Sequence, residues 1–392
     1  MQPGAKIDLA RMRRGRRQRL LAAMTDQGLD ALVLLGQSNQ EYAGITRPLS
    51  DAMRVHYEPN VVLLSSAGEL NVWTWYPEGA LDVPAANVHR GIALEMDAGP
   101  LLEAIGALLP DARRIGIDEL TAPLIDALGR LAPRVQFVDA APATVPARLI
   151  KTADEIACLR VAQSITETAM VDVAAALRPG VRQTELSAVF FRRVFELGIT
   201  WSCVDPIWNV TPRSTAAGAS TTHGGVGFPL TADDRFIRDG DLIMTDVGLV
   251  WNGYHSDFGK TWLCGFDARP DPKLQRCFDR WRTLIDAVYA AIRPGRTCAD
   301  VARDARRIEP VFSVEHFYLG HGTGCDAAEL PFIGSELGPA FEDTVVLTPG
   351  MTIVLEPVIW EDGVGGYRSE EMVVVTQDGC ERLSSYGYAP FE

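Results

Sequence analysis

The fold is decided by a stretch near the middle of the chain, Thr245-Asp246-Val247-Gly248-Leu249-Val250-Trp251-Asn252-Gly253-Tyr254-His255-Ser256-Asp257. The dipeptide Asn252-Gly253 favours a tight type I′ turn, because both central residues of that turn need a positive φ angle. The stretch therefore predicts two short strands joined at this turn. Counting outward from the turn pairs Asp257 with Gly248, so Asp246 and Asp257 share one face as diagonal neighbours.

The two aspartates of this hairpin are aimed at one spot. Diagonal cross-strand positions lie roughly 7–8 Å apart at the backbone, within reach of side chains that lean together. Two carboxylates this close repel each other unless a proton or a cation lies between them. The pattern predicts a metal site, and the alternative is a pair of solvated aspartates on a polar strand face.

Length and composition indicate a two-domain globular protein. The 392 residues exceed what one hydrophobic core usually holds. Hydrophobic residues make up 47% and charged residues 22%, which leaves enough apolar material for two cores. The net charge of −14 argues against nucleic acid or a polyanion as a partner, because the chain has no basic stripe to displace phosphate counterions.

The cysteines and the apolar segments favour a cytoplasmic location. The seven cysteines form no Cys-x-x-Cys pair and their number is odd, which is typical of free thiols in a reducing compartment. The apolar run at residues 31–35 follows an arginine-rich segment and is too short to span a membrane. No signal-peptide cleavage pattern accompanies it, so we expect no membrane partner.

The first part of the chain alternates predicted strands and helices. Helical patterns cover residues 9–28 and 120–131, and strand patterns cover residues 31–35, 61–65, 71–75, 114–117 and 135–138. This alternation predicts an α/β domain over residues 1–146. Two prolines make residues 141–146 the expected linker, and residues 147–392 are the expected second domain.

The second domain carries a weak internal repeat. A helical pattern over residues 151–177 ends at Arg178-Pro179-Gly180, and another over residues 274–292 ends at Arg293-Pro294-Gly295. A further helical pattern follows each copy, at residues 185–197 and 299–307. We expect two related halves about a pseudo-twofold axis, with a site between them. The alternative is coincidence, because Pro-Gly after a helix is common.

Three more ionisable residues lie in settings that suit a buried site. His321 is surrounded by glycines in Gly320-His321-Gly322-Thr323-Gly324, which lets the backbone come close to whatever the imidazole binds. A lone histidine is more often structural. Glu356 and Glu370 stand at strand patterns, where a buried carboxylate is costly unless it is paired or bound to a cation.

The pita-bread metallohydrolases have a metal-ligand set that this chain resembles at Asp246, Asp257, His321, Glu356 and Glu370. The residues stand in the settings D-x-G-x-x-x-x-G-Y-x-S-D, G-H-G-x-G, E-P and G-G-x-R-x-E. This superfamily includes aminopeptidase P, prolidase, methionine aminopeptidase and creatinase. The resemblance implies a creatinase/prolidase-type α/β N-terminal domain and an α+β pita-bread domain with pseudo-twofold internal symmetry.

The resemblance also implies a dinuclear metal-dependent hydrolase of the Xaa-Pro aminopeptidase or prolidase type. Asp257 and Glu370 would bridge two divalent cations, and Asp246 would bind one of them. His321 and Glu356 would bind the other. Oxygen-rich ligands without thiolates favour manganese, cobalt or iron, with zinc as a further candidate. A water between two such ions becomes a hydroxide at neutral pH, which would attack the amide bond.

The chain departs from the peptidases of this superfamily at Ala328. In those enzymes the G-H-G-x-G stretch continues to a second histidine, just before a glutamate, that stabilises the tetrahedral intermediate. Here Ala328 stands in that place, before Glu329. Another family histidine, ahead of the first metal aspartate, is out of register, and His223 is the nearest candidate. We expect His223 and Glu329 to be catalytic residues.

This departure keeps a second function open. Creatinase, ectoine hydrolase and dimethylsulfoniopropionate lyase are relatives that act on small zwitterions. The chain resembles them in Gly365-Gly366-Tyr367-Arg368 and in its ending, Tyr386-Gly387-Tyr388-Ala389-Pro390-Phe391. The alternatives are therefore an Xaa-Pro peptidase and a hydrolase or lyase of a small zwitterion. The intact ligand set argues against a catalytically silent binding protein.

Five residues are candidates for binding the substrate. Aromatic faces suit a cationic nitrogen, so we expect Trp208 and Tyr254 in the pocket, although they could equally fill the core. Arg368 belongs to the motif next to Glu370. The loop at residues 49–58 carries Arg54 and His56. In creatinase-like relatives this loop crosses to the neighbouring subunit, where its arginine binds the substrate carboxylate. The resemblance therefore implies a homodimer with shared sites. The alternative is an ordinary solvated loop.

Overall fold

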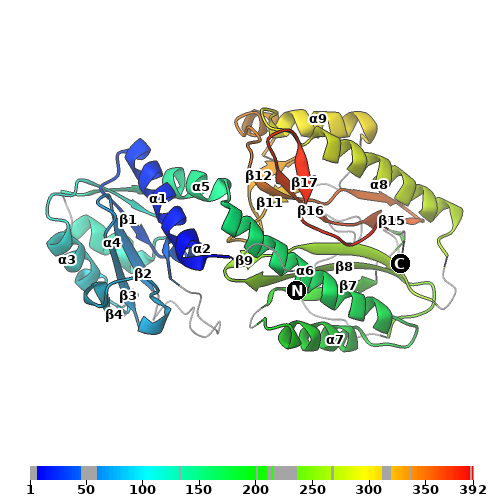
Figure 1. The fold of residues 1–392 in the computed structure, drawn as a ribbon, viewed down its shortest axis with the longest axis horizontal. Coiled ribbons are helices and arrows are strands. Elements are labelled where there is room, and N and C mark those ends of the chain that lie inside the picture. Colours follow the sequence, from blue (N-terminus) through cyan, green and yellow to red (C-terminus); the bar gives the residue numbers. More distant parts are fainter. Residues whose placement is uncertain are drawn as a thin grey trace. The chain divides into compact units, whose positions relative to one another are not determined.

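The computed structural model describes residues 7–45, 60–94, 96–131, 134–199, 202–210, 213–214, 236–265, 269–310, 319–335, 337–388 and 391. The chain divides into two compact units, Met1–Asp154 and Glu155–Glu392 (Figure 1). The segment expected as a linker, residues 141–146, instead lies within helix α5 (Ala141–Leu149), whose first turn accommodates one of the two prolines. The division after residue 146 stays a prediction.

The first unit is an α/β domain on one sheet with the strand order β4-β3-β2-β1-β5-β6. Strands β1, β5 and β6 run parallel, and β2 pairs antiparallel with β1. The strands are β1 (Ala31–Leu34), β2 (Val61–Ser65), β3 (Leu70–Thr74), β4 (Val88–Arg90), β5 (Arg114–Ile117) and β6 (Gln136–Asp139). The remaining helices are α1 (Leu9–Gln27), α2 (Gln37–Ala43), α3 (Gly99–Leu108) and α4 (Ala122–Leu131).

Local sequence signals explain where these elements begin and end. The side chain of Asp8 accepts a hydrogen bond from the backbone N–H of Arg11 and so caps the start of α1. Gly28 ends the helix in the left-handed conformation, with φ of 60°. Among the described residues, no helix is both long and apolar enough to cross a membrane.

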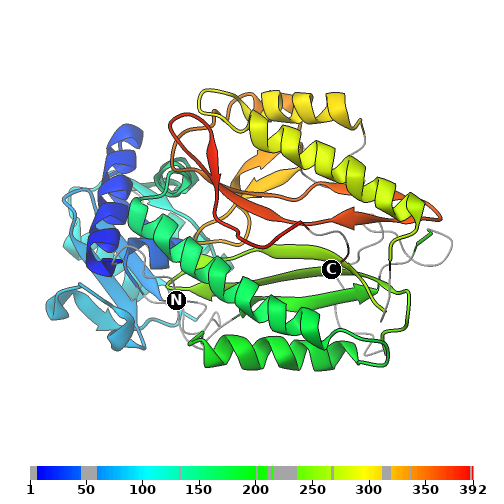
Figure 2. The same ribbon diagram turned by 45° about the vertical axis from the view of Figure 1, so that its right-hand side comes forward.

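The second unit has an α+β architecture in which strands lie between two pairs of helices (Figure 2). The helices are α6 (Ala153–Ala176), α7 (Gln183–Glu196), α8 (Pro272–Ala291), α9 (Cys298–Ile308) and α10 (Pro339–Glu342). Strands β7 (Ser202–Val210), β8 (Leu242–Trp251), β9 (Tyr254–His255) and β10 (Phe258–Leu263) form one sheet. Strands β11 (Gly320–Gly322), β12 (Glu329–Ile333), β13 (Thr352–Leu355), β16 (Glu371–Val375) and β17 (Cys380–Arg382) form another, and β14 (Val358–Glu361) pairs with β15 (Gly365–Arg368).

The two halves of this unit repeat one design. The backbone N–H of Gly180 donates to Ile237 O at 2.7 Å, and the N–H of Gly295 donates to Leu347 O at 2.9 Å. Both glycines have positive φ angles, 87° and 85°. An antiparallel bridge follows each of them. The two Arg-Pro-Gly sequences therefore mark equivalent places in two related halves and are not a coincidence.

The predicted hairpin is confirmed. Asn252 and Gly253 have φ angles of 50° and 80°, as the type I′ turn requires. Strand β10 continues the register that this turn imposes, because Gly259 pairs with Asp246. Asp257 stands two residues before Gly259, so it faces the same side as Asp246.

Candidate metal centre

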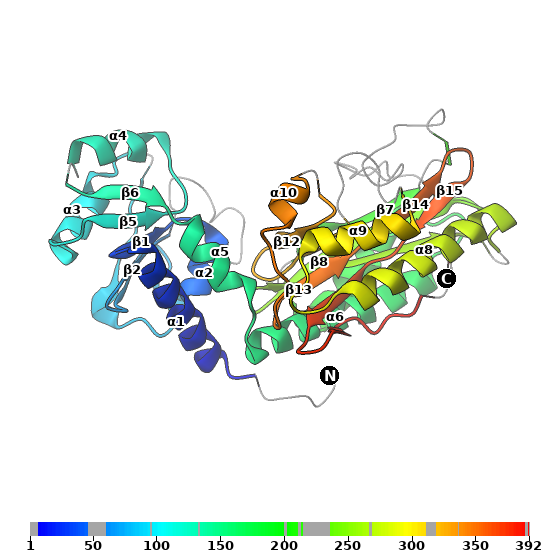
Figure 3. The same cartoon turned by 90° about the horizontal axis from the view of Figure 1, so that it is seen from above.

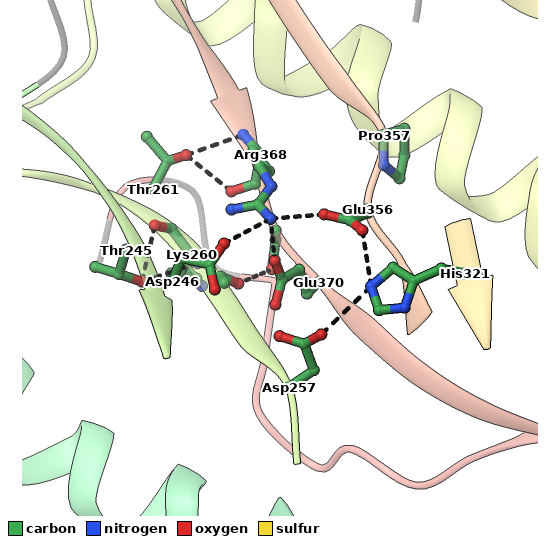
Figure 4. A network of polar contacts seen from close by, with 12 residues as sticks. Thr245, Asp246, Asp257, Lys260, Thr261, His321, Glu356, Pro357, Arg368 and Glu370 are labelled. Carbon is green, nitrogen blue, oxygen red and sulfur yellow. Dashed lines mark hydrogen bonds and ion pairs between the residues drawn. The ribbon is translucent and has the colours of Figure 1, made fainter. Parts of the chain in front are cut away.

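Four carboxylates and one imidazole converge in the second unit (Figure 4). The first half supplies Asp246 on β8 and Asp257 directly before β10. The second half supplies His321 on β11, Glu356 directly after β13 and Glu370 directly before β16. One oxygen each of Asp246, Asp257 and Glu370 lies within 4.8 Å of the others. The structure thus brings all five predicted metal-ligand residues together, in a group called the acid cluster below.

His321 is oriented by the backbone of the next residue. Its Nδ1 lies 2.9 Å from the carbonyl oxygen of Gly322, which turns Nε2 toward the carboxylates. Nε2 lies 3.0 Å from Glu356 Oε1 and 3.4 Å from Asp257 Oδ2. Burial lowers the pKa of His321, but the hydrogen bonds and charges of these two acids outweigh burial and raise the pKa to about 10. The imidazole therefore presents one nitrogen to the acid cluster.

Two glycines permit neighbouring segments of the chain to approach each other closely at the cluster. A Cβ atom on Gly259 would lie 2.7 Å from Cδ of Glu370, inside van der Waals contact. A Cβ atom on Gly320, next to His321, would lie 2.4 Å from the backbone oxygen of Val354. A side chain at Gly259 would displace the Glu370 carboxylate, and a side chain at Gly320 would push β11 away from β13.

Arg368 lies inside the acid cluster and is 2% exposed. Its Nη2 is 3.1 Å from Asp246 Oδ2 and 2.6 Å from Glu356 Oε2, and it also contacts Glu370 Oε1. Thr261 holds its backbone through hydrogen bonds of 2.8 and 2.9 Å. Its Nη2 is thus engaged by three buried carboxylates, and the predicted role of Arg368 in binding substrate stays a prediction.

The donor set of the cluster fits a divalent cation. Burial raises the pKa of Asp246, the charge of Arg368 lowers it, and the charges of the neighbouring acids raise it. Together these effects bring the pKa of Asp246 to about 7. The same causes raise the pKa of Glu370 well above its ordinary value. Among the described residues, Glu370 Oε2 is buried without a hydrogen-bond partner. A cation bound here would relieve the repulsion between the carboxylates, and oxygen-rich donors of this kind suit hard divalent metals.

Two predicted pocket residues lie in the core instead. Trp208 is 3% exposed, stacks on Trp262 at 6.4 Å and donates its indole N–H to Ser187 Oγ at 2.8 Å. Tyr254 is fully buried and its hydroxyl bonds Glu155 on α6. The polar groups of both side chains bond residues on helices, Ser187 on α7 and Glu155 on α6, and their predicted role in binding substrate stays a prediction.

The remaining predicted site residues fall in two groups. Glu329 begins β12 and pairs with Gly322, the neighbour of His321, so the structure places its backbone beside the cluster. Arg54, His56 and His223 lie outside the described residues. Their proposed roles stay predictions.

His255, which has no role assigned from the sequence, makes hydrogen-bonding contacts beside the cluster. Its backbone N–H donates to Gly324 O at 2.9 Å, and its Nδ1 lies 3.1 Å from the same oxygen. These contacts tie the hairpin to the glycine loop that follows His321. The available signal was its position two residues before Asp257, which places both side chains on one face of a regular strand.

Solved structures share this fold. The prolidase from Pyrococcus horikoshii OT3 superimposes with a TM-score of 0.76 at 22% identity, covering 95% of this chain and 98% of that one. The dipeptidase PepE from Mycobacterium ulcerans gives a TM-score of 0.75 at 22% identity, over 98% of this chain and 99% of that one. The predicted pita-bread architecture is confirmed.

The sequence comparisons agree with the structural comparisons. The chain is 29% identical over 240 residues to an Xaa-Pro dipeptidase of Pyrococcus furiosus and 30% identical over 244 residues to a probable dipeptidase PepE of Mycobacterium bovis. The alignments cover 60% and 61% of this chain, and the chain spans 63% and 59% of the length of those relatives. Residues 16–150 match the creatinase/prolidase N-terminal domain. Because residues 157–377, more than half of the sequence, match metallopeptidase family M24, the chain belongs to that family.

Proposed function

We propose that this protein is a divalent-metal-dependent hydrolase that cleaves the amide bond of Xaa-Pro peptides. The observation that carries the proposal is the acid cluster, in which four carboxylates and one imidazole from both halves meet in a buried site. Membership of a metallopeptidase family and similarity to an Xaa-Pro dipeptidase support it.

The proposed ligand roles follow the resemblance and the positions of the side chains. Asp257 and Glu370 would hold both of two cations, Asp246 would bind one of them, and His321 with Glu356 would bind the other. Manganese, cobalt or iron suits this set best, and zinc is a further candidate. When bound, the metals supply a Lewis acid for the amide carbonyl and lower the pKa of the attacking water.

The chain's own residues prepare the cluster for this role. Gly322 holds His321 with Nε2 facing inward, so the imidazole offers its nitrogen in one orientation. Arg368 contacts three of the carboxylates and offsets part of their charge, which keeps the oxygens in place. Glu329, beside Gly322, and His223 are our proposed catalytic side chains.

A second candidate function rests on Ala328. A metal-dependent hydrolase or lyase of a small zwitterion would not need the histidine that peptidases use at this position. Ala328 directly precedes β12, one residue before the position that pairs with Gly322, so the missing imidazole would have stood near His321. This observation favours a substrate handled without that histidine.

The two functions are separated by one set of assays. The protein is stripped of metal with a chelator, reloaded separately with Mn²⁺, Co²⁺, Fe²⁺ or Zn²⁺, and assayed with Xaa-Pro dipeptides, ectoine, creatine and dimethylsulfoniopropionate. We expect metal-dependent release of proline from the dipeptides. Turnover of a zwitterion alone would select the second function, and failure of the protein to bind any of these metals would contradict both.

We also propose a cytoplasmic homodimer in which the loop at residues 49–58 completes the partner's site, with Arg54 and His56 on the substrate carboxylate. A guanidinium suits that task because its planar fork binds both carboxylate oxygens. The odd number of scattered cysteines supports the cytoplasm. Mixing Arg54→Ala subunits with Asp257→Ala subunits should restore one intact site per heterodimer. An inactive, verified heterodimer would contradict the shared site.

A further inference from the structure

The C-terminal end of the chain, Leu383 to Tyr388 with Phe391, forms a segment that we call the C-terminal strap. It follows β17 and runs alongside α6, at the red end of the colour scale in Figures 2 and 3. The metal-binding proposal assigns this segment no task. Its contacts join the two halves of the second unit on the side away from the acid cluster.

The strap is bonded to the second half next to Glu370. The N–H of Leu383 donates to Met372 O at 2.7 Å, and the N–H of Met372 donates to Ser384 Oγ at 2.8 Å. The hydroxyl of Tyr388 contacts the carboxylate of Glu371, which is fully buried and directly follows Glu370. The backbone that carries Glu370 is therefore tied to the strap through its two following residues.

Arginine side chains reinforce this attachment. The guanidinium of Arg382 contacts the carboxylate of Glu371 and lies 4.5 Å from the ring centre of Tyr388. The guanidinium of Arg282, from α8, lies 4.7 Å from the same ring centre. A cation near an aromatic face is attracted to it, so Tyr388 is held at both its hydroxyl and its ring.

The strap is bonded to the first half next to Asp257. Lys260 is 1% exposed and donates from Nζ to Gly387 O at 2.8 Å, with the same nitrogen 5.2 Å from the ring centre of Tyr386. Phe258 meets the ring of Tyr386 edge-on at 5.0 Å. Because side chains alternate along a strand, Phe258 and Lys260 face away from the side that carries Asp257.

A chain of hydrogen bonds also runs from the strap to the backbone of Asp257. The N–H of Ser385 donates to both oxygens of Glu167, at 2.9 and 3.1 Å. The side-chain amide of Gln163 donates to Glu167 at 3.4 Å and accepts from the N–H of Asp257 at 3.3 Å. Glu167 and Gln163 are both buried on α6. The strap therefore reaches Asp257 by a second, independent route.

We propose that the C-terminal strap is a positioning element that fixes the separation of Asp257 and Glu370. These two carboxylates come from different halves of the unit, so their distance depends on how the halves are held together. At the cluster the halves also meet directly, through the hydrogen bond from Glu370 N–H to Gly259 O at 2.9 Å and through the contacts of Arg368 and His321 described above. The strap joins the residues next to each acid from the opposite side. The inference rests on the proposed metal-binding function.

The test measures metal binding as well as activity. Wild-type protein, Glu167→Ala and Tyr388→Phe are stripped and titrated with Mn²⁺ by calorimetry and with Co²⁺ by visible absorption, which reports coordination geometry. We expect each variant to bind the more weakly held metal at least about tenfold less tightly and to change the Co²⁺ spectrum, as loss of supporting contacts around metal ligands typically does. Glu167→Gln keeps an acceptor for Ser385 and should restore part of the affinity.

Tyr289→Phe is the matched control. Its hydroxyl donates to Cys380 O at 3.0 Å, so the change removes a comparable hydrogen bond in the same unit without touching the strap. It should lower thermal stability and leave metal affinity and the Co²⁺ spectrum unchanged. Unchanged metal binding in folded Glu167→Ala and Tyr388→Phe would overturn the strap inference but not the proposed function. If Glu167→Ala does not fold, the metal affinity of Tyr388→Phe decides whether the strap inference holds. Absence of metal binding in the wild type would overturn the proposed function as well.

Discussion

Replacing Gly259 with alanine should weaken metal binding as well as lower the stability of the fold. Gly259 lies on β10 opposite Asp246, and its φ angle is not in the left-handed region, so the backbone itself accepts alanine. The new methyl group would lie 2.7 Å from Cδ and 2.8 Å from Oε1 of Glu370. These atoms are the end of a side chain, so the carboxylate has to move while the strands stay in place.

The size of the effect follows from these distances. Carbon atoms in contact are separated by roughly 3.5–4.0 Å, so the Glu370 carboxylate has to shift by about 1 Å. Overpacking of this kind costs about 1–3 kcal/mol in stability. Metal–ligand distances tolerate only about 0.2 Å, so a displaced bridging ligand should weaken metal binding by ~10–100-fold, or about 1.4–2.7 kcal/mol.

Titration of metal-free Gly259→Ala with Mn²⁺, together with thermal unfolding of the metal-free protein, separates the two effects. Gly379→Ala is the matched control, because a Cβ at that position has no heavy atom within 4 Å. We expect the control to keep wild-type metal affinity. Wild-type affinity and an unchanged Co²⁺ spectrum in Gly259→Ala would refute the reasoning, because Glu370 could then hold its metal while displaced.

Three further predictions concern the same site. Asp257→Ala should abolish activity and tight binding of the second metal, because loss of a bridging carboxylate leaves the repulsion between the ions unscreened; elemental analysis that finds two metals per chain would contradict the bridging role. Ala328→His should raise kcat/KM for Xaa-Pro dipeptides at least ~10-fold if only the missing histidine limits peptide cleavage, since a positioned acid–base group contributes about that much or more; an unchanged rate would favour a zwitterionic substrate. Metal binding should release protons and tighten as the pH rises from about 6 to 8. Burial and neighbouring acids raise the pKa of Asp246 to about 7, and the hydrogen bonds to Asp257 and Glu356 outweigh burial and raise the pKa of His321 to about 10. Both side chains therefore hold protons that a metal displaces. Calorimetry in buffers of different ionisation enthalpy measures this release, and a pH-independent affinity would contradict it.

The position of the first two acids could be predicted from sequence because one turn sets their register. A type I′ turn needs positive φ angles at both central residues, and few dipeptides adopt them as readily as Asn252-Gly253 does. Once the turn is placed, strand pairing is fixed residue by residue, and Gly259 opposite Asp246 follows by counting. The inference needed no knowledge of distant parts of the chain.

The surroundings of the acids could not be predicted in the same way. Trp208 lies on β7, whose pairing partner is more than thirty residues away in sequence, so its buried face depends on tertiary packing. For two other residues a local signal existed. Tyr254 is three residues from Asp257 and so faces the opposite side, whereas Arg368 is two residues from Glu370 and so shares its face. Strand parity alone predicts that Tyr254 joins the core and that Arg368 joins the acids.

The repeat is weak in the sequence but clear in the structure, because the two halves share only the residues that determine the backbone conformation. Gly240 and Gly350 have φ angles of 78° and 94°, and each stands two residues before a strand, β8 or β13. Asp246 and Glu356 each lie six residues after their glycine. Equivalent turns thus deliver one carboxylate from each half to the same buried place, and the apolar residues between them differ because many side chains fill a strand face equally well. A site at the axis of such a repeat needs the two halves to be held in register, which is why contacts far from the acids, such as those of the strap, bear on metal binding.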